Sequence, residues 1–130
     1  FQHLLKDLPV LRLDHASAFT YSRERLASSY GFSRQVCGST KARRRREFME
    51  RQQQISLSIN RERYTGKTVP VIVDYIGTTA ITGRTLLDAP DIDNVLTLNI
   101  RKGVPLPSIG DVCQASISEI GPYDLKGMLA

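Results

Sequence analysis

The sequence predicts a mainly β protein with one long helix, in which the helix precedes a small five-stranded antiparallel barrel. In residues 66–130, apolar residues recur at every second position in short runs, and Gly, Pro and Asp separate these runs, as is typical of strands and turns. In residues 41–64 there is no Gly or Pro, and Arg, Glu, Gln and Met, which favour helices, are frequent. The length of 130 residues suits one small domain with an appendage.

The first 38 residues are predicted to contain a helix, a strand and a loop. Phe1, Leu4, Leu5 and Leu8 recur at helical spacing, and Pro9 is expected to end that helix. Leu11, Leu13 and residues 16–21 predict a buried strand, and residues 22–40 show no period. A helix and a strand are half of an α/β unit and cannot close a core alone. We therefore expect them to pack either on residues outside this sequence or on the residues that follow them.

The long helix is predicted over residues 41–64, with Ser39 or Thr40 as its N-cap and Thr65-Gly66 at its end. Its apolar positions form a narrow stripe: Phe48, Ile55 and Ile59, interrupted by Gln52 and flanked by Met49 and Leu57. A stripe this narrow suits a helix that lies along the surface of another domain.

Five strands are predicted, around residues 69–75, 80–85, 96–100, 113–118 and 125–129. Pro70 places the first of them at an edge or at a strand start, because proline has no amide hydrogen to donate. Short strands joined by Gly, Pro and Asp turns indicate a closed or nearly closed barrel of the OB type. A domain of this size buries only about 60% of its unfolded surface, so packing by the long helix would stabilise it.

The net charge of +5 is confined to one segment. Residues 41–63 carry eight basic and three acidic residues, whereas the barrel, residues 66–130, carries five basic and seven acidic ones. The run Arg43, Arg44, Arg45 and Arg46 is either a phosphate-binding patch or a solvated helix face paired with Glu47 and Glu50. Beside these four arginines the segment has no aromatic residue that could stack on bases. This absence favours the interpretation as a solvated helix face.

Few residues suggest metal chemistry. Cys37 and Cys113 are too few for a disulfide framework or a metal site, so we expect two free thiols in a reducing compartment, with Cys113 buried on its strand. His3 and His15 have no Cys or Glu at ligand spacing and are interpreted as surface or hydrogen-bonded histidines. The aspartates of residues 88–93 lack the Gly and Glu that a calcium loop requires.

Residues 83–93, GRTLLDAPDID, resemble the TRAM-domain signature of radical-SAM methylthiotransferases of the RimO type. Gly66-Lys67, Gly110-Asp111-Val112 and residues 123–127 occur where that family has them. Residues 45–56 resemble the helix that joins the radical-SAM barrel to TRAM, and residues 13–22 resemble the last strand of that barrel. Two departures, Arg25-Leu26-Ala27 in place of a Gly-Thr pair and Cys37 in place of Pro, fall within residues 24–38.

The resemblance implies three parts: residues 1–38 as the tail of an α/β radical-SAM barrel, 39–65 as the connecting helix, and 66–130 as the TRAM β-barrel. It implies a parent enzyme that uses two 4Fe-4S clusters and S-adenosylmethionine to methylthiolate the β-carbon of an aspartate in a small-subunit ribosomal protein. The cluster-binding cysteines of the family fall outside this stretch. We therefore expect no catalytic, cofactor-binding or metal-binding residue here, and no activity from this chain alone.

We expect the barrel to bind substrate through a charged rim: Arg84, Asp88, Asp91, Asp93, Arg101 and Lys102. The acidic balance of the barrel suits a basic ribosomal protein. The alternatives are a tRNA methylthiotransferase of the MiaB type and a stand-alone RNA-binding barrel, and Arg43 to Arg46 could add a contact with RNA or the ribosome. The chain has neither a membrane-spanning run nor a signal peptide, so we expect a cytoplasmic monomer.

Overall fold

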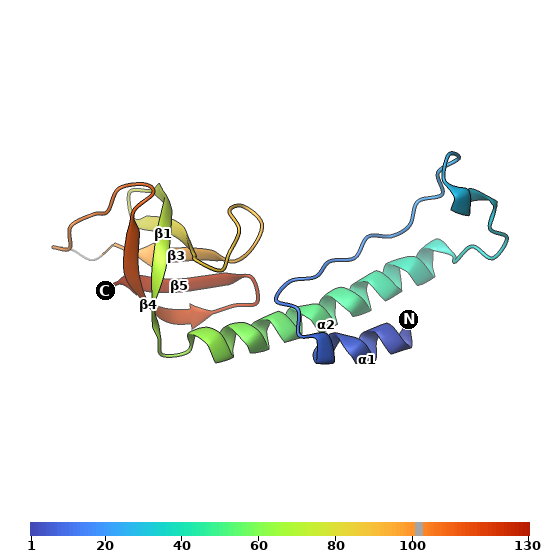
Figure 1. Ribbon diagram of the computed structural model, residues 1–130, viewed down its shortest axis with the longest axis horizontal. Helices are drawn as coiled ribbons and strands as arrows, with labels where there is room; N and C mark the ends of the chain where they lie inside the picture. Colours follow the sequence, from blue (N-terminus) through green and yellow to red (C-terminus); the bar gives the residue numbers. More distant parts are fainter. Residues whose placement is uncertain (101–102) are drawn as a thin grey trace.

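The computed structural model describes residues 1–100 and 103–130. It contains two α-helices, a short 3-10 helix and five strands: α1 (Gln2–Leu11), η1 (Ser28–Gly31), α2 (Gly38–Tyr64), β1 (Thr68–Ile76), β2 (Ala80–Thr85), β3 (Val95–Asn99), β4 (Val112–Ile120) and β5 (Asp124–Leu129). Figure 1 shows the barrel at the C-terminal end of α2, while α1 and a long coil lie along the rest of that helix. Neither α-helix combines the length and the apolar character that a bilayer crossing requires.

The five strands close into a barrel in the order β1-β2-β3-β5-β4, which confirms the predicted barrel of the OB type. Four of the neighbouring pairs are antiparallel, and β3 and β5 run parallel. A closed ring with an odd number of strands cannot alternate direction throughout, so a wholly antiparallel barrel was not attainable. Pro70 lies at the start of β1, before the pairing with β2 begins at Val71, as its missing amide hydrogen predicts.

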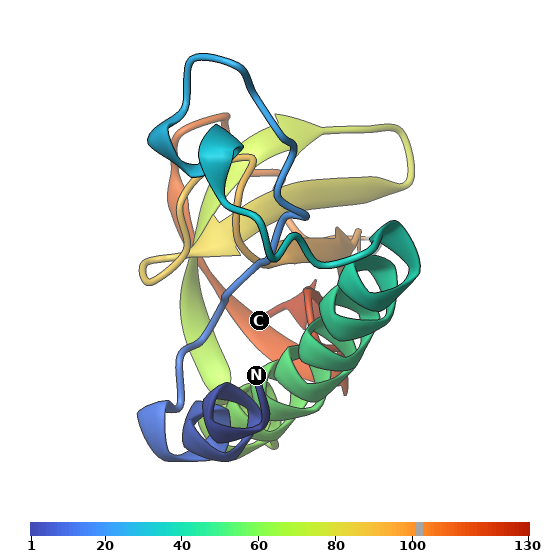
Figure 2. The same cartoon turned by 90° about the vertical axis from the view of Figure 1, so that its right-hand side faces the viewer.

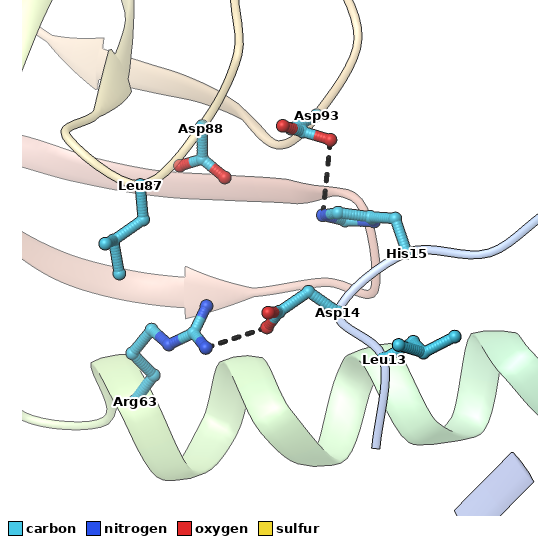
Figure 3. Close-up of a pocket in the computed structure, with 7 residues that line it drawn as sticks. All are labelled: Leu13, Asp14, His15, Arg63, Leu87, Asp88 and Asp93. Atoms are coloured by element: carbon cyan, nitrogen blue, oxygen red, sulfur yellow. Dashed lines mark ion pairs between the residues drawn. The ribbon is translucent and has the colours of Figure 1, made fainter. Parts of the chain in front are cut away.

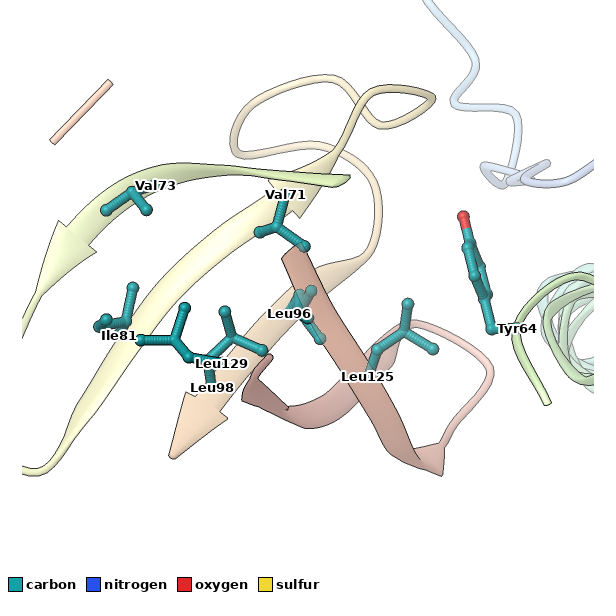
Figure 4. Close-up of a cluster of buried hydrophobic side chains, with 9 residues drawn as sticks. Tyr64, Val71, Val73, Ile81, Leu96, Leu98, Leu125 and Leu129 are labelled. Carbon is teal, nitrogen blue, oxygen red and sulfur yellow. The ribbon is translucent and has the colours of Figure 1, made fainter. Parts of the chain in front are cut away.

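The barrel interior is filled by side chains from alternate strand positions and from the last residue of α2. The buried residues are Tyr64, Val71, Val73, Ile81, Leu96, Leu98, Ala115, Leu125 and Leu129 (Figure 4). The Tyr64 hydroxyl lies 3.3 Å from the hydroxyl of Thr85, so its polar end is hydrogen-bonded inside the barrel. At Gly83 a Cβ atom would lie 2.3 Å from the carbonyl oxygen of Ile72, so only glycine allows β1 and β2 this close an approach.

Both helices begin or end differently from the prediction. α1 continues through Pro9 to Leu11, because a proline in the last turn removes only one hydrogen bond before the helix ends at Arg12. α2 begins at Gly38, with Cys37 as its N-cap. Ser39 and Thr40 therefore lie inside the first turn, and the prediction that one of them caps the helix is wrong.

The apolar stripe of α2 packs on α1. Phe48, Ile55 and Ile59 are buried together with Leu8 of α1, and this second cluster confirms the predicted stripe. Gln52, which seemed to interrupt the stripe in the sequence, is wholly buried. Its side-chain amide group donates to the carbonyl oxygen of Leu13 and to the hydroxyl of Ser56, at 2.8 and 3.2 Å.

The strand predicted at Leu11, Leu13 and residues 16–21 does not form, and Leu11 belongs to the last turn of α1. Residues 12–24 run as coil along α2, as Figures 1 and 2 show, and the described residues offer no neighbouring strand with which they could pair. We call residues 13–21 the strap. Side chains of α2 donate to its carbonyl oxygens at 2.6–3.0 Å: Lys41 to Tyr21, Arg45 to Ala18, Gln52 to Leu13 and Ser56 to Asp14.

Candidate substrate-binding site

The loop between β2 and β3 is shaped from within by two of its aspartates. The Asp88 carboxylate accepts hydrogen bonds from the backbone amide and hydroxyl of Thr85 and, at 2.9 Å, from the side-chain amide of Asn94. The Asp93 carboxylate accepts from the backbone amide of Ala89 at 2.8 Å. Asp91 is exposed and has a left-handed backbone with φ 61°, a conformation that Asp tolerates better than most residues. Two aspartates of the signature, Asp88 and Asp93, therefore stabilise the conformation of this loop through local hydrogen bonds.

The end of α2 is tied to the same part of the barrel by a buried amide. The side-chain NH₂ of Asn60 donates to the Asn94 side chain at 3.1 Å and to the carbonyl oxygens of Gly121 and Pro122 at 3.0 and 3.2 Å. Asn60 and Asn94 are both buried. These bonds fix the helix against the base of the β2–β3 loop and of the turn before β5.

A cleft of about 400 Å³ lies where the strap, α2 and the β2–β3 loop meet (Figure 3). Its lining residues are Leu13, Asp14, His15, Arg63, Leu87, Asp88 and Asp93. Two contacts link the cleft walls in Figure 3: the ion pair of Arg63 with Asp14 at 2.7 Å, and the approach of the His15 imidazole to the Asp93 carboxylate at 3.9 Å. The cleft thus presents three carboxylates against one arginine and one imidazole.

The β2–β3 loop beside the cleft is apolar as well as acidic. Leu86, Leu87 and Ile92 project from the β2–β3 loop with 61%, 69% and 81% of their surfaces exposed. Exposed aliphatic residues next to carboxylates form a surface that can bury apolar groups of a partner and attract its basic groups. This combination suits a basic protein segment better than a nucleic-acid backbone, which would meet the carboxylates with repulsion.

The structure brings together only part of the predicted rim. Asp88 and Asp93 line the cleft, and Asp91 lies at the exposed tip of the same loop. Arg84 lies on β2 and pairs with Asp74 of β1 at 2.6 Å, so its charge is held on the barrel wall. Arg101 and Lys102 lie outside the described residues.

Sequence reasoning missed the half of the cleft that comes from outside the barrel. Asp14 and His15 belong to the strap, and Arg63 belongs to the last turn of α2. His15 is held between Asp93 and the ring of Tyr123, whose centroid is 6.0 Å away. The signal available in the sequence was the polar Asp14-His15 pair, which interrupts an otherwise apolar run.

Three of the four consecutive arginines of α2 contact different groups. Arg43 pairs with Glu47 at 2.8 Å, as predicted from their spacing. The guanidinium of Arg44 lies 5.5 Å from the centre of the Phe1 ring, and Arg45 donates to the strap at Ala18. Part of the predicted solvated face therefore holds the N-terminal segment in place.

Both cysteines are free thiols in different environments. The hydroxyl groups of Ser39 and Thr40 lie 3.4 and 3.1 Å from the exposed sulfur of Cys37, and their hydrogen bonds to the thiolate lower the pKa of Cys37 to about 7. Cys113 is partly buried against the barrel core, and this burial raises its pKa. Across residues 1–100 and 103–130, no three His, Cys, Asp or Glu side chains are grouped as metal ligands.

A closed five-stranded barrel, with Gly83 where β1 and β2 approach closely and a β2–β3 loop shaped by aspartates, defines a small β-barrel module of the OB type. The TRAM domain model matches residues 65–129, half of the chain, and the chain belongs to the TRAM domain family.

The relatives extend the match beyond the barrel. The chain is 39% identical over 127 residues to the ribosomal protein uS12 methylthiotransferase RimO of Mannheimia succiniciproducens, which covers 98% of this chain and 28% of the relative. It is 35% identical to the proteins of the same name from Chlorobium limicola and Methylobacterium radiotolerans, over 98% and 100% of this chain and 29% and 28% of theirs. The chain thus spans less than a third of the length of these relatives, and it matches their TRAM region, as the resemblance implied.

The clusters that the family implies do not fit the residues of this chain. A radical-SAM cluster is held by three cysteine thiolates, and this sequence has two cysteines. Cys37 precedes α2 and Cys113 lies in the barrel beyond its other end, so a helix about 40 Å long separates the two thiols. No step of iron–sulfur chemistry is assigned to these residues.

Proposed function

We propose that this chain is the substrate-recognition portion of a radical-SAM methylthiotransferase that modifies the β-carbon of an aspartate in the small-subunit ribosomal protein uS12. The observation that carries this proposal is the acidic and apolar cleft beside the β2–β3 loop, in a chain similar to RimO proteins over nearly its whole length. The relatives bear the name of a uS12-modifying enzyme. A ribosomal protein is basic, so the cleft carboxylates would attract it and orient it during encounter.

We propose the same three parts that the sequence implied. Residues 1–38 would be the end of the radical-SAM domain, 39–65 the connecting helix and 66–130 the TRAM barrel. The parent enzyme would supply two 4Fe-4S clusters and S-adenosylmethionine, and this chain alone would bind no cluster and have no activity. It would act in the cytoplasm as a monomer.

Within this proposal, the charged groups of the cleft and the exposed residues of the β2–β3 loop have different tasks. Asp88 holds the β2–β3 loop in shape, so that Leu87 and Asp93 line the cleft. The Arg63–Asp14 pair fixes the strap on α2 at the opposite wall. Asp93 and the exposed Asp91 would then receive lysine or arginine side chains of the partner, while Leu86 and Ile92 cover apolar atoms.

Binding to a peptide tests the proposal. The 130-residue chain is titrated with a labelled uS12 peptide that spans the target aspartate, and with a tRNA-like hairpin, at two salt concentrations. Asp91→Asn with Asp93→Asn should slow peptide association several-fold and flatten its salt dependence. The matched control is Glu119→Gln with Asp124→Asn, which removes the same charge from barrel positions away from the cleft lining.

The tRNA-modifying alternative predicts the opposite pattern. It requires tight hairpin binding with a steep salt slope and peptide binding that the Asp91 and Asp93 changes leave untouched. An equal loss of peptide affinity in the control variant would show a general charge effect and would contradict the assignment of the cleft.

A further inference from the structure

Two buried polar side chains at the C-terminal end of α2, those of Asn60 and Tyr64, bond to the two ends of the β2–β3 loop. Both residues are 2% exposed, and their separation of four positions places them on one face of the helix. The Asn60 amide donates to the Asn94 side chain at 3.1 Å, and Asn94 directly precedes β3. The Tyr64 hydroxyl lies 3.3 Å from that of Thr85, which ends β2. The helix therefore contacts the loop at its beginning and at its end.

Both ends of the loop are in turn bonded to one carboxylate, that of Asp88. The Asn94 amide donates to one Asp88 oxygen at 2.9 Å, and the Thr85 hydroxyl donates to the other oxygen. Because the single proton of the Thr85 hydroxyl goes to a group that only accepts, the Tyr64 hydroxyl is the donor to Thr85. One chain of donors therefore runs from Asn60 through Asn94 to Asp88. The other runs from Tyr64 through Thr85 to the same carboxylate.

The Asp88 carboxylate differs in this respect from the other two carboxylates of the loop. It accepts two hydrogen bonds from Thr85 and one from Asn94, so it ties the end of β2 to the start of β3. Asp91 is exposed, and the Asp93 side chain keeps 23% of its surface exposed. Asp88 thus gives the loop its shape, while Asp91 and Asp93 provide charge for a partner.

We propose that Asn60 and Tyr64 are positioning residues, which set from α2 the conformation in which the β2–β3 loop binds a basic peptide. The inference rests on the proposed function, because it takes this loop as the place where the peptide binds. Both side chains are too deeply buried to touch a partner, so they act through Asp88. A loop that is already held in its binding conformation loses less conformational entropy when a partner binds. Loss of either donor therefore weakens binding without the loss of any contact with the peptide.

An exchange of the two side chains at the centre of this network separates positioning from charge. Asp88→Asn alone places an NH₂ group against one of the donors, and Asn94→Asp alone places two carboxylates against each other. The double variant keeps the total charge and restores a donor opposite each acceptor. Its new amide donates to its new carboxylate, which still accepts from Asn60.

The test measures peptide affinity and amide exchange in the 130-residue chain. Each single variant should bind the labelled uS12 peptide at least about tenfold more weakly, and the double variant should return to within about threefold of the parent chain. Hydrogen exchange of the Leu87 and Ala89 amides, which bond inside the loop at 3.3 and 2.8 Å, should accelerate in the single variants and recover in the double variant. The controls Glu119→Gln and Asn99→Asp make the same charge changes at exposed barrel positions and should alter affinity less than about twofold.

Tyr64→Phe tests the helix side of the network, because it removes the donor and keeps the ring that packs in the barrel. It should weaken peptide binding about threefold and accelerate exchange of the Leu87 amide, which bonds to the Thr85 hydroxyl. The control is Tyr75→Phe at an exposed tyrosine of β1, and circular dichroism verifies that each variant is folded.

Two results would overturn the proposal: a double variant that binds no better than the single variants, or a Tyr64→Phe chain that behaves like the Tyr75→Phe control. Either result would leave the proposed function intact, since the parent chain would still bind the peptide. A parent chain that does not bind the peptide would contradict the proposed function instead. The exchange rates of the Leu87 and Ala89 amides would then decide by themselves whether α2 positions the loop.

Discussion

The regions at the two ends of α2 differ in how completely their apolar side chains are buried. At its C-terminal end, Tyr64 joins a closed barrel whose strands pair all the way round and whose core residues are almost completely buried. Along the rest of the helix, Phe48, Ile55 and Ile59 form a smaller cluster with Leu8 of α1, and in the coil before the helix Phe19, Leu26 and Phe32 remain exposed. One helix therefore connects a region that encloses its own core with a region whose apolar side chains are only partly covered.

The difference follows from how the backbone is satisfied. A closed ladder pairs the amides and carbonyls of every strand and leaves no edge. The strap has no strand beside it in the described chain. Instead, side chains of α2 donate hydrogen bonds to its carbonyl oxygens. A segment held only on one side keeps its other side available for contacts.

The largest effect is expected inside the barrel. Leu96→Ala removes a side chain with no exposed surface, and we expect it to lower the free energy of unfolding by about 3–5 kcal/mol. The control is Leu26→Ala, where the same change at an exposed position should cost no more than about 0.5 kcal/mol. Urea titrations of both variants measure the difference, and similar midpoints would mean that the two regions do not differ in packing.

A smaller effect is expected in the cluster between α1 and α2. Phe48→Ala and Ile55→Ala should each cost about 2–3 kcal/mol, near the lower end of the usual range, because both residues keep some exposed surface, 7% and 9%, in a cluster of four buried residues. Arg44→Ala, on the exposed face of the same helix, should change stability little. Hydrogen exchange should show the loss of protection in α1 and α2 and not in the barrel.

The coupling of the two regions depends on Asn60. Asn60→Ala leaves two backbone carbonyl oxygens and the Asn94 side chain without this donor, and we expect a loss of about 1–3 kcal/mol. Asn99→Ala, at an exposed residue of β3, is the matched control. If the helix is fastened to the barrel here, melts followed by helix and barrel signals should separate in the Asn60 variant and coincide in the control.

The smallest effect concerns the thiols at the two ends. Alkylation of Cys37 should follow a titration with a midpoint near pH 7, whereas Cys113 should react only at distinctly higher pH. Since the folded-state pKa of Cys37 lies below its usual value of 9.0, the thiolate stabilises the folded form above that value, and this contribution is lost as the pH falls through 7. Ser39→Ala with Thr40→Val should move the midpoint upwards. Equal rates for both thiols at pH 7 would contradict these environments.

The sequence alone determined those features that depend on neighbours along the chain. Alternation placed five strands, the run without Gly or Pro placed α2, and the stripe of Phe48, Ile55 and Ile59 placed its buried face. The GRTLLDAPDID motif identified the loop that Asp88 and Asp93 fold, because those hydrogen bonds are local. Periodicity and turn formation depend on residues that are close in the sequence, so the sequence alone can predict them.

Tertiary structure decided everything that required distant segments to meet. It left residues 16–21 without a strand partner, so their strand-like sequence runs as coil along α2. It buried Gln52, which interrupts the apolar stripe in the sequence, and gave its side chain a hydrogen bond to the strap. It also brought Asp14 and His15 to the cleft, and Phe19 and Phe32 to the arginine run. These contacts join residues tens of positions apart, and their energies depend on which backbone groups remain unsatisfied after the barrel has closed.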